Sequence, residues 1–355
     1  MSAESPSLRP RPLVSVLVPC RNERPYIAAC LDSIFATDYP PERLEVLLVD
    51  GRSDDGTREI IERYSAEHPG RPIRLIDNPQ RITPVALNTG IRAARGDIVL
   101  RMDAHVFYPP NYIPRLVAAL EEMGADNVGG VLVTRPAGPG TMAKAIAVAL
   151  SHSFGVGNSY FRIGVRTPRW VDTIAFFCCR RELFDRVGMF DEELVRHQDG
   201  EFNGRLIKQG GRILLIPDVT SYYYARGSVR QVARMYFQYG YFKPVVARKL
   251  GRFMSGRQLI PPAFVLSLLG SALLAPWVSA AAWLFGGIAG AYAAAVLTFS
   301  ALAIRRHGLR CALALAAVFP VLHLSYGFGF IRRALELISF RRPHTRAIAE
   351  LPLSR

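Results

Sequence analysis

The sequence predicts an α/β domain with a mostly parallel sheet, followed by a C-terminal α-helical membrane region. Two observations carry this prediction. Over the first hundred residues, apolar runs of strand length alternate with segments whose apolar residues recur at helical spacing. Alternation of this kind is typical of βαβ units. Farther along, the stretch from Leu259 to Ile304 contains no charged side chain, which is enough for two spanning helices of about 20 residues each.

Polar residues follow three of the four apolar runs that we interpret as strands. The runs are "LVSVLV", "LEVLLV", "IRLI" and "DIVLRM". Arg21 and Glu23 follow the first run, Asp50 follows the second, and Asp103 and His105 follow the fourth. Parallel strands place their carboxyl ends at one edge of the sheet, where ligands bind in such folds. We therefore expect these side chains to share a site.

The rest of the chain has a less regular pattern after Pro109. We expect a helix over 113–123, a strand from Trp170 to Cys179, and a last strand from Arg212 to Ile216 that Pro217 closes. The chain then divides into a polar N-terminal tail, an α/β domain, a basic amphipathic juxtamembrane segment, a membrane region and a basic C-terminal tail. The predicted boundaries are 1–12, 13–220, 221–258, 259–331 and 332–355.

The net charge of +15 is concentrated beside the apolar segments. Between Ser221 and Arg257 there is no acidic residue, whereas the basic residues are Arg226, Arg230, Arg234, Lys243, Arg248, Lys249, Arg252 and Arg257. Basic residues beside membrane helices face the cytoplasm and anionic lipid headgroups. We therefore prefer membrane lipids to nucleic acid as the partner of this charge, and the sequence contains no familiar nucleic-acid motif.

The cellular location follows from several weaker features. The N-terminus has no apolar h-region, so we expect no secretory signal. The five cysteines lack zinc-type or disulfide-framework spacing, which favours reduced thiols in a cytosolic setting. We expect a multi-pass protein of the cytoplasmic membrane, with the α/β domain on the cytoplasmic side.

The membrane region leaves one question open. Pro276 or the pair Gly286-Gly287 is expected to mark the turn between its first two helices. A third apolar segment covers 311–331. If it spans the membrane, the basic tail after it lies outside, against the positive-inside tendency. A re-entrant or interfacial segment removes that conflict, and both alternatives stand.

Each polar cluster has a simple structural interpretation when taken alone. "SDDGT" is typical of a turn followed by a helix cap, and "HQDGEF" of an exposed helix start. Together, however, the clusters meet the needs of sugar transfer from a nucleotide. Asp103 and a second ligand two residues later can hold a divalent metal against a diphosphate, and Asp50 can accept from a pyrimidine N–H. Asp199 can take the proton of an attacking hydroxyl.

The order of these segments resembles family 2 glycosyltransferases of the GT-A (Rossmann-like) fold. The resemblance covers roughly Leu13 to Pro217 and lies in four segments: "VSVLVPCRNERPYIAACLDSI", "VDGRSDDGT", "ALNTGIRAARGDIVLRMDAH" and "FDEELVRHQDGEFNGRLIKQGGRILLIP". With its C-terminal membrane region, the chain is most similar to bacterial exopolysaccharide transferases of the succinoglycan type. This resemblance implies inverting transfer of a sugar, glucose first among the candidates, from a UDP-sugar. The implied acceptor is a lipid-linked (polyprenyl-diphosphate) saccharide at the cytoplasmic membrane face.

The resemblance also assigns nucleotide-binding roles to individual residues. Pro19, Arg21 and Glu23 match the loop of the nucleotide pocket, and Asp50 matches the aspartate that binds the base. Asp103 matches the first acid of the family's DxD motif, so it is expected to hold the diphosphate and a metal, Mn²⁺ or Mg²⁺.

Further matches concern catalysis. Asp199 matches the catalytic base, and Arg205 matches a basic position in the same helix that steadies this carboxylate or the substrate. "QYGYFK" stands where processive members carry "QxxRW", and its poor match favours single addition over polymerisation. Arg226 and Lys243 are candidates for contact with a diphosphate.

Three departures from the family pattern keep other functions open. Gly51, His105 and Gln198 replace acids of the motifs "VDD", "DxD" and "ED". An imidazole suits Mn²⁺ better than Mg²⁺, so His105 is either a metal ligand or a phosphate contact. One alternative function is a polyprenyl-phosphate sugar transferase, whose phosphate nucleophile needs no base. Another is a membrane-anchored protein that binds nucleotide sugars without turnover.

Overall fold

The computed structural model describes residues 11–339, so the tail segments 1–10 and 340–355 lie outside the described residues. The α/β prediction is confirmed. A nine-stranded sheet has the order β3-β2-β1-β4-β8-β6-β9-β5, and β7 pairs with β9 beside this path. The strands are β1 (Val14–Cys20), β2 (Leu44–Asp50), β3 (Ile73–Asp77), β4 (Ile98–Arg101), β5 (Val106–Phe107), β6 (Asn127–Arg135), β7 (Arg169–Trp170), β8 (Cys178–Arg180) and β9 (Ile213–Tyr224).

Strands β1 to β4 form a parallel block, with β1 between β2 and β4, and β6 and β9 are also parallel to each other. The strands of this block are apolar on both faces, as expected for a sheet that is covered by helices on each side. In β1, Val16 contributes to the core beneath one helical layer, and Leu17 to the core beneath the other. The helices of the first layer are α1 (Ile27–Phe35), α2 (Thr57–Glu67) and α4 (Tyr112–Glu122). Those of the second are α3 (Thr83–Ala93), α8 (Leu183–Val187) and α9 (Gln198–Lys208).

Two strand predictions differ from the structure. The predicted strand from Trp170 to Cys179 is two short strands, β7 and β8, separated by a loop. The loop leaves the sheet at Asp172, whose carboxylate binds the Arg257 guanidinium through two hydrogen bonds of 2.8 and 3.0 Å. The last strand was expected to end at Pro217, yet β9 continues to Tyr224.

Strand β9 accommodates Pro217 through a register shift against β6. Gly130 pairs with Ile216, but the next residue, Val131, pairs with Thr220. The three residues between these pairs bulge out of the ladder, so the missing N–H of proline leaves no ladder hydrogen bond unmade. Gly130 is required at this point because a Cβ there would lie 2.4 Å from the Val219 carbonyl oxygen.

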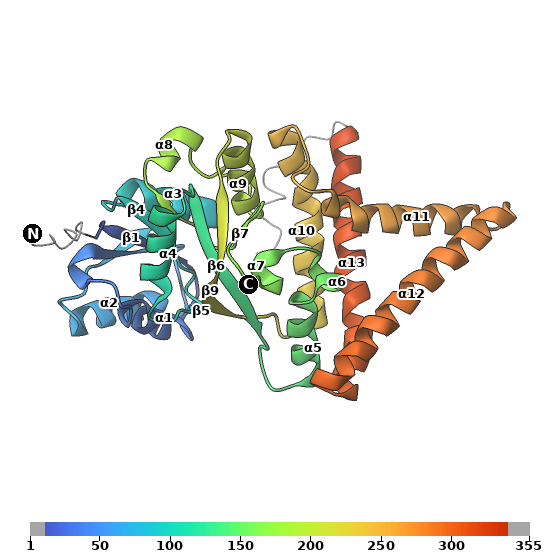
Figure 1. Ribbon diagram of the computed structural model, residues 1–355, viewed down its shortest axis with the longest axis horizontal. Coiled ribbons are helices and arrows are strands. Elements are labelled where there is room, and N and C mark those ends of the chain that lie inside the picture. Colours follow the sequence, from blue (N-terminus) through green and yellow to red (C-terminus); the bar gives the residue numbers. More distant parts are fainter. Residues whose placement is uncertain (1–10, 340–355) are drawn as a thin grey trace, which may run out of the picture.

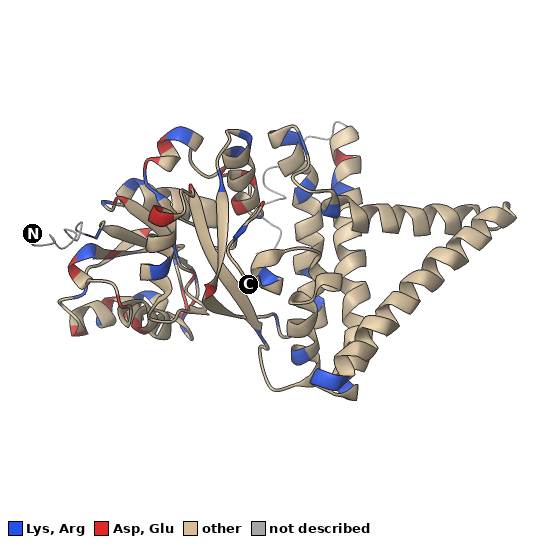
Figure 2. Cartoon of the chain, in the orientation of Figure 1, with Lys and Arg blue, Asp and Glu red and all other residues tan. Residues whose placement is uncertain are grey.

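The C-terminal region is helical, as predicted. It consists of α10 (Val229–Leu250), α11 (Ile260–Leu274), α12 (Ser279–His307) and α13 (Leu309–Ile338). Figure 1 shows α11 leaving α10 and α13 nearly at right angles and α12 returning diagonally to the far end of α13. The turn between α11 and α12 falls at Pro276, whereas Gly286 and Gly287 lie inside α12. Figure 2 shows no charged residue along α11 or most of α12.

Three helical stretches among the described residues are long and apolar enough to cross a membrane: Gly256–Leu274, Ser279–His307 and Leu309–Ile338. The third is one continuous helix, α13, from Leu309 to Ile338. Helix α13 packs closely on α10. A Cβ on Gly240 would lie 1.9 Å from the Tyr326 carbonyl oxygen, and a Cβ on Gly329 would lie 2.1 Å from the Phe237 carbonyl oxygen. These glycines allow the two backbones to touch.

Shorter helices connect the sheet to this C-terminal region. They are α5 (Thr141–Leu150), α6 (Ser153–Val156) and α7 (Tyr160–Ile163). Figure 1 places α6 and α7 between the sheet and the pair of α10 and α13. The α/β domain and the apolar helices therefore share one boundary, and the candidate site lies along it.

Candidate functional site

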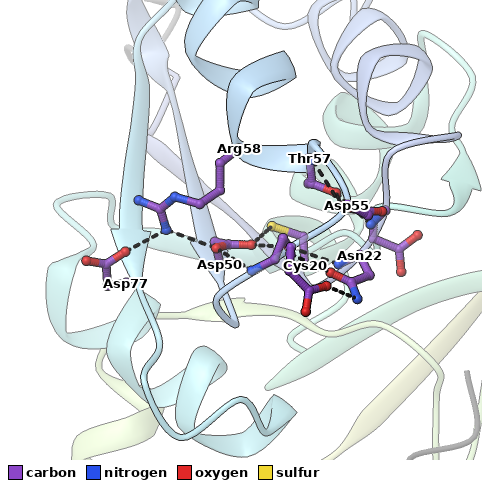
Figure 3. A network of polar contacts seen from close by, with 10 residues as sticks. Cys20, Asn22, Asp50, Asp55, Thr57, Arg58 and Asp77 are labelled. Atoms are coloured by element: carbon purple, nitrogen blue, oxygen red, sulfur yellow. Dashed lines mark hydrogen bonds and ion pairs between the residues drawn. The ribbon is translucent and has the colours of Figure 1, made fainter.

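The loops after β1 and β2 are joined by side-chain hydrogen bonds (Figure 3). Asn22 exchanges two hydrogen bonds with Asp54, at 2.9 and 3.0 Å. The backbone N–H of Glu23 donates to the Thr57 hydroxyl at 2.8 Å. Asp55 accepts from the Thr57 backbone N–H at 3.1 Å, which fixes the start of α2. The polar residues of "SDDGT" thus shape the rim of the sheet.

The Arg21 side chain packs against Gly51, the residue that follows Asp50. The aliphatic part of the Arg21 side chain lies across Gly51, and a Cβ on Gly51 would stand 3.2 Å from Arg21 Cδ. Together with Pro19 and Glu23, Arg21 and Gly51 line a cavity at the carboxyl ends of the strands. Gly51 therefore makes room for the Arg21 side chain.

Asp50 lies beneath this cavity. Its side chain is fully buried, and it accepts hydrogen bonds from Arg58 at 2.9 Å and from the Ser53 backbone N–H at 3.1 Å. Arg58 also binds Asp77 at the end of β3 at 2.6 Å. The Ser53 hydroxyl donates to the other oxygen, Oδ1, so Ser53 and Arg58 occupy both carboxylate oxygens, and Asp50 does not itself line the cavity.

Arg101 connects the two most important predicted residues. Its Nε and Nη2 atoms donate to the two oxygens of Asp103 at 2.8 and 3.2 Å. Its Nη1 atom donates to Asp199 Oδ1 at 2.7 Å. One buried guanidinium thus holds the carboxylate after β4 and the carboxylate at the start of α9 on the same cavity wall.

Asp199 has the properties of a general base. It lies in the first turn of α9 and lines the cavity. Burial raises the pKa of its carboxyl above the usual aspartate value, Arg101 opposes this rise, and the charge of Asp103 adds to it. A raised pKa makes the carboxylate a better proton acceptor than an ordinary aspartate.

His197 fixes the start of α9 on α10. Its backbone is left-handed, with φ of 62°, which is uncommon for a residue other than glycine. Its Nε2 atom lies 2.9 Å from the Tyr239 carbonyl oxygen and donates to it. Burial, followed by the charges of Lys243 and Arg196, lowers the pKa of this imidazole well below its usual value, so the ring is neutral. The ring thereby holds Asp199 in its position on the cavity wall.

The two candidate metal ligands each have another partner. His105 Nδ1 lies 3.1 Å from Glu23 Oε1, whereas the Asp103 carboxylate is bound by Arg101. Within residues 11–339, no group of three or more His, Cys, Asp or Glu side chains has the arrangement of a metal site. Asp103 alone fits a hard divalent ion, and it would have to share its oxygens with Arg101. The remaining ligands would have to come from the diphosphate and water.

The remaining predicted residues fall into two groups. Arg226 and Lys243 line the same cavity as Asp103 and Asp199. Arg205 does not line it. Its guanidinium binds Glu201 at 2.6 and 2.9 Å and the carbonyl oxygens of Val187 and Met189 at 2.5 and 2.6 Å. These contacts tie α9 to the end of α8 and give Arg205 a positioning role.

Two residues of the site were not singled out in the sequence. Arg101 could have been identified from the sequence, because a charged residue at the end of a buried apolar strand needs a partner of opposite charge. No sequence pattern pointed to Arg257, because its partner Asp172 lies 85 residues earlier in the chain. The cavity that Arg101 and Arg257 line has a volume of about 1500 Å³ and continues from the strand ends to Phe264 of α11, Tyr292 of α12 and His323 of α13.

The fold and the carboxylates at the strand ends define a GT-A glycosyltransferase domain, and comparison with known proteins identifies the family. Residues 15–188 match the family model "Glycosyl transferase family 2". "Succinoglycan biosynthesis protein ExoA" of Rhizobium meliloti (strain 1021) is 33% identical over 330 residues, which cover 92% of this chain and 96% of that protein. The chain therefore belongs to glycosyl transferase family 2.

Other relatives share less of the chain. The Methanococcus voltae dolichyl N-acetyl-alpha-D-glucosaminyl phosphate 3-beta-D-2,3-diacetamido-2,3-dideoxy-beta-D-glucuronosyltransferase is 28% identical over 72% of this chain and 80% of its own. The undecaprenyl-phosphate 4-deoxy-4-formamido-L-arabinose transferase of Pseudomonas savastanoi pv. phaseolicola (strain 1448A / Race 6) is 35% identical over 49% of this chain and 52% of its own.

Solved structures agree on the fold. The Pyrobaculum calidifontis mannosyltransferase PcManGT, in complex with GDP-Man and Mn²⁺, superimposes with a TM-score of 0.56 at 23% identity. The match covers 94% of this chain and 88% of that one. S. aureus TarS 1-349 in complex with UDP-GlcNAc gives a TM-score of 0.51 at 18% identity, over 90% of this chain and 92% of that one.

Proposed function

We propose that this protein is an inverting glycosyltransferase that moves a sugar, with glucose first among the candidates, from a UDP-sugar to a lipid-linked saccharide. The acceptor class is a polyprenyl-diphosphate saccharide, and the pathway is synthesis of an exopolysaccharide or another cell-surface glycan. The observation that carries the proposal is the Arg101 fork. It joins Asp103, at the expected place of the diphosphate, to Asp199, at the expected place of the base.

The proposed reaction uses these residues directly. Pro19, Arg21 and Glu23 contact the nucleotide, and Asp50 completes that pocket from below. Asp199 takes the proton of the acceptor hydroxyl while its oxygen attacks the anomeric carbon from the face opposite the nucleotide. The bond to the diphosphate breaks, and UDP leaves with the electron pair, so the anomeric configuration inverts.

A divalent metal, Mn²⁺ or Mg²⁺, fits this site through Asp103. When bound, it would offset the negative charge of the leaving diphosphate. Arg101 holds the Asp103 carboxylate toward the cavity before the nucleotide arrives. His105 contacts Glu23 through Nδ1, which leaves Nε2 as the nitrogen that would bind a metal or a phosphate.

The proposed location is the cytoplasmic membrane, with several membrane crossings and the catalytic domain on the cytoplasmic side. Helices α11 and α12 form the apolar arm, and its tip carries Trp277 and Trp283, which are 77% and 84% exposed. The opposite end of α12 is basic, with Arg305 and Arg306 in its last turn. Basic residues at the end nearest the catalytic domain favour a cytoplasmic position for that end.

A second candidate is a polyprenyl-phosphate sugar transferase, where the lipid phosphate itself is the nucleophile. The observation that favours it is Lys243, whose ammonium lies beside Gly200 and thus next to Asp199 in the chain. A cation there suits a phosphate close to the reacting carbon. A non-catalytic nucleotide-sugar-binding protein is less favoured, because binding alone needs no carboxylate with a raised pKa.

Nucleotide titration tests the donor half of the proposal. UDP, GDP, dTDP and CDP are titrated into the detergent-purified protein with Mn²⁺, with Mg²⁺ and with chelator, alongside D103A. We expect UDP to bind most tightly, to need metal, and to lose at least tenfold in affinity in D103A. If no nucleotide binds, or if chelator has no effect, the metal-dependent donor site proposed here is wrong.

A further inference from the structure

The cavity extends beyond the part that the nucleotide-sugar donor would occupy. It continues past Asp199 into a chamber between α7, α10 and the bases of the apolar helices. Aromatic and cationic side chains line this chamber: Arg162, Tyr236, Lys243, Arg257, Phe264 and Tyr292. Apart from Arg257, its lining residues come from α7, α10, α11 and α12. It therefore connects the reacting centre with the apolar arm.

The positive charges of the chamber favour the binding of an anion. Lys243 makes no hydrogen bond or ion pair with any side chain or backbone group in residues 11–339, and its Nζ lies 3.9 Å from the position of a Cβ on Gly200. Arg162 Nη1 is buried and has no hydrogen-bond partner in the same range. Lys243 is half-buried, and cationic groups removed from water without a hydrogen-bond partner are costly unless a ligand completes them.

The one acidic group in this part of the chamber is already bound. Arg257 binds both oxygens of Asp172, so a single carboxylate faces two cationic groups, Arg257 and Lys243. Burial, and then the charge of Arg257, lowers the pKa of Lys243 to about 8, although Asp172 acts in the opposite direction. An anion in the chamber would relieve this charge imbalance.

The outer wall of the chamber is aromatic and its polar atoms are satisfied. The Phe264 and Tyr292 rings lie 4.4 Å apart between centroids. The Tyr292 hydroxyl bonds to His323 Nδ1 at 2.8 Å, and His323 Nε2 bonds to the Phe154 carbonyl oxygen at 2.8 Å. Beyond this wall, α11 and most of α12 present only uncharged side chains (Figure 2). A hydrocarbon chain leaving the chamber would thus meet apolar surface.

We propose that this chamber is the site of the acceptor lipid. Lys243 and Arg162 bind the phosphate groups of a prenyl-linked acceptor, and its prenyl chain leaves along α11 and α12. This inference rests on the proposed function and adds the acceptor position to it. Because Lys243 stands beside the start of α9, the reacting oxygen must lie close to the phosphate groups. That condition is met by a polyprenyl phosphate or by a lipid diphosphate that carries a short saccharide.

Binding in phosphatidylcholine nanodiscs tests the proposal. The probes are farnesyl diphosphate, inorganic pyrophosphate and UDP, with empty nanodiscs as the partition control. The variants are K243Q and K243R. The matched control is R248Q, which removes a charge from an exposed position of the same helix. We expect K243Q to weaken farnesyl diphosphate at least tenfold and UDP less than twofold. K243R should stay within threefold of the wild type, and R248Q should be unchanged.

The probes separate the possible sources of a phosphate signal. In the wild type, farnesyl diphosphate should bind at least tenfold more tightly than pyrophosphate, because burial of the prenyl chain adds apolar stabilisation. Equal affinities for farnesyl diphosphate and pyrophosphate would overturn the proposal that the prenyl chain binds along α11 and α12. An equal loss of UDP and farnesyl diphosphate in K243Q would assign Lys243 to the donor and overturn the acceptor site.

A second variant keeps the test valid if K243Q fails to fold. R162Q should also weaken farnesyl diphosphate and spare UDP, and unchanged farnesyl diphosphate binding in both variants would overturn the proposal. Failure of the wild type to bind UDP would instead count against the proposed function. The two failures are thus distinguishable in one set of titrations.

Discussion

The two ends of the cavity balance their charges in opposite ways. At the donor end, Asp50, Asp103 and Asp199 are each held by an arginine from the chain itself. At the chamber end, Lys243 has no counter-ion within residues 11–339, and Asp172 is already bound by Arg257. The donor end is therefore arranged before any ligand binds, whereas the chamber end needs an anionic ligand to complete it. Substitutions at the two ends should separate donor binding, catalysis and acceptor binding.

The largest effect is expected from D199N. Loss of the carboxylate removes the proton acceptor and should lower kcat for sugar transfer roughly 10³-fold, within the range typical of general bases. UDP affinity should change less than threefold, because the nucleotide loop lies on other strands. Transfer of radiolabelled sugar to a lipid extract measures kcat, and UDP titration measures the donor site.

D185N is the matched control for D199N, since Asp185 is exposed and lies on α8. It should retain wild-type transfer. Turnover of D199N close to that of the wild type would remove Asp199 from the role of base. It would favour the second candidate, in which a lipid phosphate attacks without a base.

R101M should have the next largest effect, because Arg101 alone joins the two carboxylates. We expect kcat to fall roughly 10²-fold, within the range by which misplacement of catalytic groups slows reactions. Arg101 also opposes the rise in the pKa of Asp199, so its loss should raise that pKa further. Since the base acts in its ionised form, the acid side of the pH–rate profile should move to higher pH. A fall in kcat with no shift of the profile would mean that Arg101 acts only on folding or on Asp103.

A glycine contact offers a test of the chamber end alone. In G240A the new methyl group would collide with the Tyr326 carbonyl oxygen, so α10 and α13 must separate. Overpacking of this kind costs about 1–3 kcal/mol. Because Lys243 follows Gly240 by one helical turn, farnesyl diphosphate binding should fall roughly tenfold while UDP binding persists. G270A is the control, since a Cβ there meets nothing within 4 Å. Wild-type farnesyl diphosphate binding in G240A would show that this packing does not shape the chamber.

The contrast between the donor end and the chamber end also explains which parts of the site could be predicted from the sequence. The donor end is built from strand ends and from loops that follow them directly, so the period of apolar residues was enough to place Arg21, Asp50 and Asp103 on one rim. The chamber end joins α7, α10 and the C-terminal helices across long separations in the chain. No local pattern could pair Lys243 with Gly200, or Arg257 with Asp172.

The errors in strand prediction have a similar origin. The predicted end of β9 at Pro217 followed the local rule that proline breaks a ladder. The rule failed because β6 supplies Gly130 at the bulge, and that partner lies far away in the sequence. Likewise, the apolar run "TIAFFCC" predicted a longer strand before Cys178, but Asp172 leaves the sheet to meet Arg257. Tertiary contacts decided both cases.

The smallest effect is expected from H105A, and it tests how the donor end differs from the usual motif. His105 contacts Glu23 through Nδ1, so its loss should remove a support of the loop after β1 and leave the metal contact of Asp103 intact. We expect the Mn²⁺ concentration that half-saturates UDP binding to change less than about threefold, against a loss of at least tenfold in D103A. UDP affinity at saturating Mn²⁺ should fall slightly, because Glu23 loses its partner. If H105A and D103A weaken the Mn²⁺ dependence equally, His105 turns toward the metal when the nucleotide binds, and the donor end is less fixed than its arginine contacts indicate.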